Sequence, residues 1–200
     1  MLVFLDFEAS SLAKKGYPIE VAWVFEDGRE ETHLIRPAPG WEDWDDAAEA
    51  IHHIDRASLL SEGMPHEQLA RHMVDQLSGH DLTASAPSWD GKWLSALLRA
   101  AGLPRHSLRL RDTEDAQRDT VRAILEGLIA DDRLKDEIEH LRAEALAGRA
   151  DGPPRHRALD DARDEYARWT AVKVAAEQLR YAIRSDHATI GPYENNLQLP

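Results

Sequence analysis

Three short segments, far apart in the sequence, carry side chains that could bind a metal ion. Asp6 and Glu8 stand in LVFLDFEASS, Asp90 in SWDGKWL, and His156 and Asp161 in HRALDDA. Residues two apart in a β-strand point to the same face, so Asp6 and Glu8 would share one face at the end of an apolar strand. Burying two acids there costs free energy unless a cation or other partners compensate. Their oxygens suit a hard divalent cation such as Mg²⁺ or Mn²⁺.

Each segment alone also has an ordinary explanation. Charged residues are common at exposed strand ends, and acids in the first turn of a helix are favoured by the helix dipole. The apolar run LVFL before Asp6 nevertheless predicts a central strand whose end opens on a cleft. Ligand sites in open α/β sheets lie preferentially at such strand ends. If the strand before Asp90 neighbours the first strand, the carboxylates of all three positions converge.

The composition indicates a globular protein without a membrane span. The 200 residues suffice for one domain, and 42% are hydrophobic and 30% charged. We expect no membrane segment and no signal peptide, because no long apolar run and no basic leader are present. The sequence has no cysteine, which rules out disulfides and cysteine-based metal sites and favours a cytoplasmic location. The net charge of −13 argues against broad binding to long nucleic acid, but it is compatible with a short strand held through metal ions.

Periodic patterns predict strands first and helices later. Alternating or continuous apolar runs predict five strands: residues 2–7, 19–26, 29–37, 81–86 and 107–112, with Asp27-Gly28 as a hairpin turn. Helical spacing predicts helices after Pro65, after a cap at Ser88, after a cap at Thr113 with a break at Asp131-Asp132, and from Leu159 to Ile183. Residues 37–63 are expected to be irregular and Gly148–Pro154 to form a loop. We therefore expect an α/β protein with a mixed five-stranded sheet flanked by helices, a domain over residues 1–183 and a C-terminal arm over 184–200.

Taken together, the three segments resemble the signatures of the DEDDh 3′→5′ exonucleases, the superfamily of the DNA polymerase III proofreading subunit, RNase T and oligoribonuclease. The D-x-E signature is matched by Asp6-Phe7-Glu8, the aromatic–Asp pair by Trp89-Asp90, and H-x-A-x-x-D by His156-x-Ala158-x-x-Asp161. The segment Ile51-His52-His53-Ile54 is similar to the I-H-G-I element of the family, although a solvated turn explains its histidines equally well. The resemblance covers residues 1–183 and implies a ribonuclease H-like fold.

The resemblance also implies a role for each of the five residues. Phosphodiester hydrolysis would use two ions, Mg²⁺ or Mn²⁺, about 3.5–4 Å apart, which hold the attacking and leaving oxygens. Asp6 would bridge both ions, Glu8 and Asp161 would complete the site on the nucleophile side, and Asp90 would hold the other ion. His156 would be the general base, because an imidazole with a reference pKa of about 6.5 can accept a proton near pH 7.

The substrate implied is the 3′ end of single-stranded DNA or RNA, in short strands. The terminal nucleotide would lie against the end of the first strand, with backbone N–H groups near Ala9 and Ser10 meeting the 3′-hydroxyl. Phe7 and Trp89 could stack on bases, although packing in the core is the alternative for both. Ile54 is a candidate wedge between bases. The choice between DNA and RNA depends on contacts to the 2′-hydroxyl, which no residue of this sequence reveals.

The sequence departs from the family pattern in two places and leaves alternatives open. ASSL follows the D-x-E in place of Thr and Gly, and SAPSWD lacks the Asn of the common H-N-x-x-F-D, so the substrate contacts are less secure than the metal site. Asp160 is a rival to Asp161, but the spacing from His156 favours Asp161. A non-catalytic nucleic-acid-binding or regulatory module of the same fold is the main alternative. A phosphohydrolase using His80-Asp81 is disfavoured, because that pair lies in a turn into a strand. A homodimer built on residues 113–147 is compatible with a nuclease.

Overall fold

A mixed β-sheet is built from the N-terminal half of the chain. Its strands are β1 (Leu2–Ala9), β2 (Pro18–Phe25), β3 (Glu30–Arg36), β4 (Met64–Pro65), β5 (Asp81–Ala84) and β6 (Leu110–Asp112), in the spatial order β4-β3-β2-β1-β5-β6. The computed structural model describes residues 1–147 and 156–189. The five predicted strands and the α/β class are confirmed. The sixth strand, β4, has two residues and is too short to show a period in the sequence.

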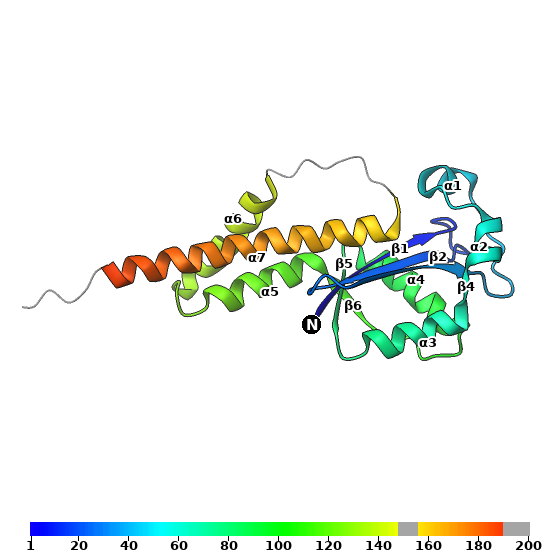
Figure 1. The fold of residues 1–200 in the computed structure, drawn as a ribbon, viewed down its shortest axis with the longest axis horizontal. Helices are drawn as coiled ribbons and strands as arrows, with labels where there is room; N and C mark the ends of the chain where they lie inside the picture. Colours follow the sequence, from blue (N-terminus) through cyan, green and yellow to red (C-terminus); the bar gives the residue numbers. More distant parts are fainter. Residues whose placement is uncertain (148–155, 190–200) are drawn as a thin grey trace, which may run out of the picture. The chain divides into compact units, whose positions relative to one another are not determined.

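Helices cover both faces of this sheet (Figure 1). On one face, Val3, Leu5 and Phe7 of β1 pack in the main hydrophobic core with α3 (His66–Leu77) and α4 (Pro87–Ala100). On the other face, Phe4 contacts Tyr166 and Trp169 of α7 (Ala158–Thr189), with ring centroids 5.8 Å and 5.5 Å away. Because side chains alternate along a strand, Asp6 and Glu8 lie on the same face as Phe4, under the beginning of α7.

The end of β1 is open on one side because its two neighbours differ in length. The antiparallel partner β2 follows β1 as far as the pair Ala9 and Pro18. The parallel partner β5 pairs only with Leu2–Phe4, and the chain then enters α4 at Pro87. Beyond Phe4, β1 therefore faces the first turn of α4 rather than another strand. This difference in length opens the cleft that was expected beside Asp6.

Two helices lie in the segment that we expected to be irregular. They are α1 (Asp46–His52) and α2 (Arg56–Glu62), and the side chains of Asp45 and Asp55 cap their N-termini by accepting from backbone N–H groups. Each helix has seven residues, which is too few for a clear helical period, so only the caps could have revealed them. The cap expected at Ser88 is also wrong. The N-cap of α4 is Ala86, and Pro87 occupies the first turn, where its fixed φ suits a helix.

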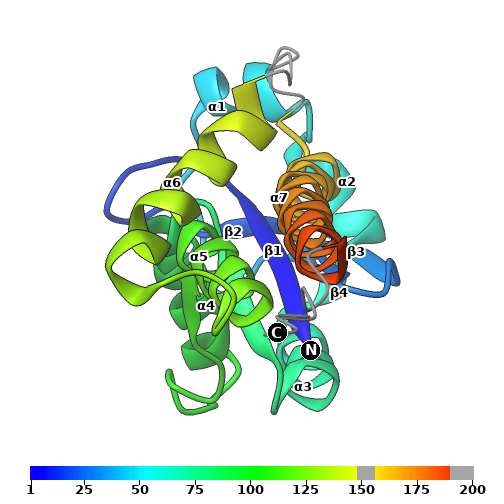
Figure 2. The same ribbon diagram turned by 90° about the vertical axis from the view of Figure 1, so that its left-hand side faces the viewer.

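The chain divides into two compact units, Met1–Ala116 with Arg149–Trp169, and Gln117–Gly148 with Thr170–Pro200. The second unit contains part of α5 (Thr113–Leu125), all of α6 (Asp131–Ala147) and part of α7, which are labelled in Figure 2. Residues of these helices form a separate apolar cluster around Val121, Ile138 and Val172. The break between α5 and α6 precedes Asp131, so Asp131 and Asp132 begin α6 instead of interrupting a helix.

The domain boundary predicted at residue 183 stays a prediction, and α7 continues through it to Thr189. The expected loop Gly148–Pro154 and the arm from residue 190 on lie outside the described residues. None of the helices within residues 1–147 and 156–189 is long and apolar enough to cross a bilayer.

Candidate active site

Three of the predicted metal ligands meet in space. Asp6 and Glu8 project from β1, and Asp161 projects from the first turns of α7. One carboxylate oxygen of each residue can be chosen so that the three atoms lie within 4.8 Å of one another. Asp160, the rival of Asp161, is not a member of this group, and it lies 3.7 Å from Arg163. Asp6, Glu8 and Asp161 are hereafter called the acid cluster.

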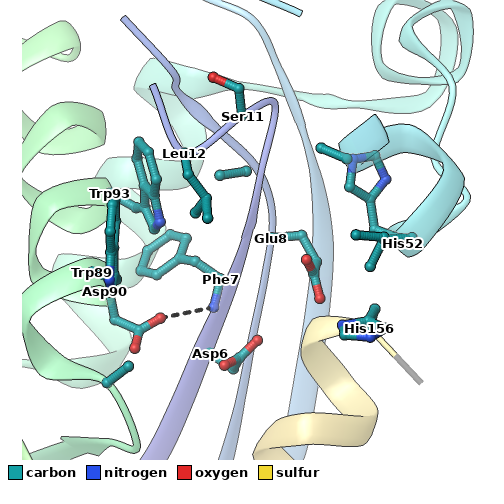
Figure 3. Close-up of a pocket in the computed structure, with 14 residues that line it drawn as sticks. Asp6, Phe7, Glu8, Ser11, Leu12, His52, Trp89, Asp90, Trp93 and His156 are labelled. Carbon is teal, nitrogen blue, oxygen red and sulfur yellow. Dashed lines mark hydrogen bonds between the residues drawn. The ribbon is translucent and has the colours of Figure 1, made fainter. Parts of the chain in front are cut away.

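Asp90 adjoins the acid cluster from the other side of β1. It lies in the first turn of α4, and its Oδ1 accepts a hydrogen bond of 3.3 Å from the backbone N–H of Phe7 (Figure 3). β5 pairs with β1 only as far as Phe4. The N–H of Phe7 therefore has no partner in β5, and Asp90 accepts its hydrogen bond instead. Asp90 is buried, with 4% of its surface exposed. The termination of β5 thus brings a fourth carboxylate to the same place.

The carboxylates destabilise one another's ionised forms. Burial first, and then the charges of Asp90, Glu8 and Asp161, raise the pKa of Asp6 well above its usual value. Burial and the nearby Asp161 raise the pKa of Glu8 to about 8. Burial likewise raises the pKa of Asp90 to about 7, even though the Phe7 N–H favours its ionised form. A dication would relieve this repulsion, and an all-oxygen donor set fits Mg²⁺ or Mn²⁺.

His156 lies two residues before the start of α7 and lines the same cavity as Asp6, Glu8 and Asp90. Its backbone is left-handed, with φ of 49°. The next residue, Arg157, binds the buried Glu20 of β2 through two hydrogen bonds of 3.1 Å and 2.6 Å, and the backbone N–H of Ala158 adds a third of 3.1 Å. These hydrogen bonds therefore attach the start of α7 to β2, the strand next to β1. This attachment sets the positions of both His156 and Asp161.

The cavity has an acidic side and an apolar side. The volume of the cavity is about 330 Å³. The residues that line it are Asp6, Phe7, Glu8, Ala9, Ser11, Leu12, Ala48, Ile51, His52, Ala86, Trp89, Asp90, Trp93 and His156. Trp89 is 43% exposed and stacks on Trp93, with ring centroids 6.1 Å apart. Leu12 and Ile51 are also exposed. Phe7 packs in the main core, as one explanation for it required, and it also lines the cavity, so its stacking on a base stays a prediction.

Two predicted substrate contacts are wrong. Ser10 is buried, its N–H donates to the Tyr17 carbonyl at 2.9 Å, and its Oγ accepts from the Tyr17 N–H at 3.1 Å. That backbone N–H is therefore unavailable to a 3′-hydroxyl. Ile54 does not line the cavity, because it is 5% exposed and packs with Tyr17, Ile19 and Leu59. The apolar side chain that α1 presents to the cavity is Ile51.

Sequence reasoning also missed residues that belong to the site. Glu165 lies one turn after Asp161, its charge contributes to the raised pKa of Asp6, and burial raises its own pKa. The spacing of four residues was visible, but several acids of this helix share it. His52 is buried, lines the cavity, and its Nδ1 accepts from the Ile54 N–H at 3.0 Å, so it is not part of a solvated turn.

The alternative site at His80-Asp81 is not assembled. Asp81 is paired with Arg111 at 2.6 Å, and the ring of His80 packs edge-on against Phe25. Neither residue lines the cavity described above.

Comparison with known proteins identifies a similar fold. No family model and no curated protein matches this sequence. The structure is similar to that of Escherichia coli exonuclease I in complex with a dA16 oligonucleotide, with 16% identity and a TM-score of 0.62, covering 90% of this chain and 42% of that one. It is also similar to a moderately thermophilic exonuclease I from Methylocaldum szegediense, with 18% identity and a TM-score of 0.60, covering 95% of this chain and 45% of that one. The chain thus spans less than half the length of these proteins. The expected ribonuclease H-like fold is confirmed.

Proposed function

We propose that this chain is a divalent-metal-dependent 3′→5′ exonuclease that acts on short single strands of DNA or RNA. The observation that supports it most strongly is the acid cluster, with oxygens of Asp6, Glu8 and Asp161 within 4.8 Å of one another. His156 and Asp90 line the cavity that contains Asp6 and Glu8, so a base and a further ligand are available. The shared fold with exonuclease I, solved with bound oligonucleotides, supports the same assignment.

The residues present fit a pair of ions, Mg²⁺ or Mn²⁺. Such ions neutralise charge that develops on the attacking and leaving oxygens of a phosphodiester. Asp6, whose carboxylate feels the charges of Asp90, Glu8 and Asp161, would be a ligand of both. Glu8 and Asp161 would complete one ion site. Asp90, which lines the same cavity, would help to hold the other.

His156 would take a proton from the attacking water. A ring nitrogen of a neutral histidine accepts a proton readily near pH 7, and general-base catalysis contributes about 10²–10⁴-fold to a rate. Burial raises the pKa of Asp161, while the adjacent His156 opposes that rise. The residue is partly exposed at the cavity and can release its proton to solvent.

The apolar side of the cavity would hold the terminal nucleotide. Trp89 offers an exposed ring for a base, and stacking on an aromatic ring accepts every base because each has a π-face. Ala9 and Phe7 would line the sugar and base beside the acid cluster. The net charge of −13 disfavours a long polyanionic partner, which supports short strands as the substrate. A cytoplasmic location and a homodimer through residues 113–147 stay predictions.

The test is digestion of short 5′-labelled DNA and RNA strands in Mn²⁺. We expect a ladder that shortens from the 3′ end with wild type, and a rate lower by about 10²-fold or more with His156→Ala. His140→Ala is the matched control, because His140 is an exposed histidine of the second unit and should leave the rate unchanged. Absence of cleavage by wild type would favour the non-catalytic binding module. Equal rates for wild type and His156→Ala would indicate a contaminating nuclease and overturn the assignment.

A further inference from the structure

We propose that Glu31, His33 and His72 form a second metal site, selective for Zn²⁺ or another first-row dication that prefers imidazole ligands. We call these three residues the histidine cluster. The ligand atoms Oε2 of Glu31 and Nε2 of the two histidines supply one oxygen and two nitrogens. This inference is independent of the nuclease proposal, because none of the three residues lines the candidate active site.

The fold brings the three residues together from two elements of the first unit. Glu31 and His33 are two apart in β3, so they share a face, and they lie beside Trp23 and Val21 of β2 in the strand register. His72 comes from α3, which packs against this face of the sheet. β4 pairs only with Ile35 and Arg36, so the part of β3 that carries Glu31 and His33 is an edge within the described sheet.

In the histidine cluster, the two histidine nitrogens lie at hydrogen-bonding distance from the Glu31 carboxylate. A bound metal ion would take the place of the protons in these hydrogen bonds. Nε2 of His33 lies 3.0 Å and Nε2 of His72 lies 2.7 Å from the same Oε2 of Glu31. Ligand atoms chosen from the three residues all lie within 4.8 Å of one another. In a tetrahedral zinc site with bonds of about 2.0–2.2 Å, ligand atoms lie about 3.3–3.5 Å apart. Outward shifts of a few tenths of an ångström in the side chains would therefore make room for the ion.

The two imidazole rings are held in place by packing. Their centroids are 5.5 Å apart with an interplanar angle of 84°. Both rings lie against the indole of Trp23, at 5.3 Å for His33 and 5.9 Å for His72, and Trp23 is fully buried. Because the rings are already ordered, little side-chain entropy is lost when an ion binds. The two histidine ligands would therefore already be in position before a metal ion binds.

Exposure and charge also suit a cation. The side chains of His33, His72 and Glu31 are 20%, 33% and 34% exposed, so an ion can enter and keep a water ligand. Histidines bind metal ions in their neutral form, so with a metal bound the Glu31 carboxylate would give the ligand set a negative charge that attracts a dication.

The donor set distinguishes this site from the acid cluster. Imidazole nitrogens favour Zn²⁺, Ni²⁺ or Cu²⁺, whereas an all-carboxylate site suits Mg²⁺ or Mn²⁺. An ion at the histidine cluster would join the edge of β3 to α3. Because the three ligands come together only in the folded chain, bound Zn²⁺ should raise the midpoint of thermal unfolding.

Calorimetric titration of Zn²⁺ into the full chain tests the site. The Asp6→Asn, Asp161→Asn double variant serves as background, because it removes two carboxylates that could also bind Zn²⁺. We expect one Zn²⁺ per chain in this background. Adding His33→Gln or His72→Gln should weaken binding by more than about 100-fold, since even the loss of a residue that only supports a ligand costs about 10–100-fold. Adding His140→Gln, at an exposed histidine in the second unit, should change nothing.

Two outcomes would overturn the site: no Zn²⁺ binding in the background, or equal binding with and without His33→Gln and His72→Gln. Imidazole nitrogen NMR of the background gives a readout without any substitution in the cluster. Zn²⁺ should shift the Nε2 resonances of His33 and His72 and leave that of His140 in place. A shift confined to His156 would assign the ion to the candidate active site and contradict the proposal.

Discussion

The acid cluster and the histidine cluster are two groups of potential metal ligands in the same unit, and they differ in how they exist without metal. In the acid cluster, burial and neighbouring carboxylates raise the pKa of Asp6, Glu8 and Asp161. In the histidine cluster, both imidazoles hydrogen-bond to one carboxylate and lower its pKa. Without metal, the carboxylates of the acid cluster repel one another, whereas the side chains of the histidine cluster hydrogen-bond to one another. We infer that the first cluster needs a bound dication to relieve its repulsion, whereas the second can be occupied or empty without strain.

The largest expected difference between the clusters is in cleavage. Asp6→Asn removes a charge from the acid cluster and should lower kcat/KM by about 10³-fold or more, because a bound dication contributes several kcal/mol of transition-state stabilisation. Glu31→Gln, the same type of change in the histidine cluster, should leave Mn²⁺-dependent cleavage as in wild type. Steady-state rates on a labelled single strand measure both. Similar losses in the two variants would remove the functional distinction between the clusters.

The next effect concerns the apolar wall beside the acid cluster. Trp89→Ala removes an exposed stacking surface, and base–aromatic stacking contributes about 1–3 kcal/mol per base. We expect an increase in KM of about tenfold with a smaller change in kcat, because the ring would bind the substrate rather than the reacting atoms. Binding of a short strand to the metal-free protein, followed by fluorescence anisotropy, measures the same contact separately. An unchanged KM would show that the terminal base lies elsewhere.

A smaller effect is expected behind the acid cluster, at the attachment of α7. Arg157→Ala leaves the buried Glu20 with only the Ala158 N–H as a partner, and an incompletely paired buried group costs about 1–3 kcal/mol. It also withdraws a positive charge that lowers the pKa of Glu8. Chemical denaturation should show a loss of stability in this range, and Mn²⁺ should bind more weakly. Arg163→Ala is the matched control, because Arg163 pairs with the more exposed Glu30 and should cost less.

The last prediction concerns the dependence of stability on pH in metal-free protein. The pKa of Glu8 is raised to about 8 and that of Asp90 to about 7, so between their unfolded values and these values the folded chain binds more protons than the unfolded chain. Stability from these groups is therefore present at low pH and is lost as the pH rises toward 8. Saturating Mg²⁺ should reduce this loss. Melting midpoints from pH 5 to pH 8, with and without Mg²⁺, measure it. A midpoint that rises with pH in the absence of metal would contradict the repulsion inferred here.

The sequence predicted those features that depend on local spacing. Alternation in LVFLDFEA placed Asp6 and Glu8 on one face, and the interval of five residues between His156 and Asp161 selected Asp161 over Asp160. Both depend on repeating geometry within one element, which is encoded in the order of residues.

Features that depend on tertiary contacts could not be predicted. Ser10 is turned away from the cavity by its two hydrogen bonds to Tyr17, and Ile54 is turned inward after α1 ends at the left-handed His53. The pair Glu31 and His33 has the spacing of a strand face, but the approach of His72 depends on how α3 packs on the sheet. None of these contacts has a period or a sequence motif.

Anomalous scattering from crystals soaked in Mn²⁺ tests the central claim most directly, which is that Asp6, Glu8 and Asp161 bind dications. We predict a peak within about 2.0–2.6 Å of carboxylate oxygens of these residues, since hard dications bind oxygen ligands at such distances. The same peak should be absent from Asp6→Asn crystals. A Mn²⁺ peak at the histidine cluster with none at the acid cluster, or an unchanged peak in Asp6→Asn, would contradict the account.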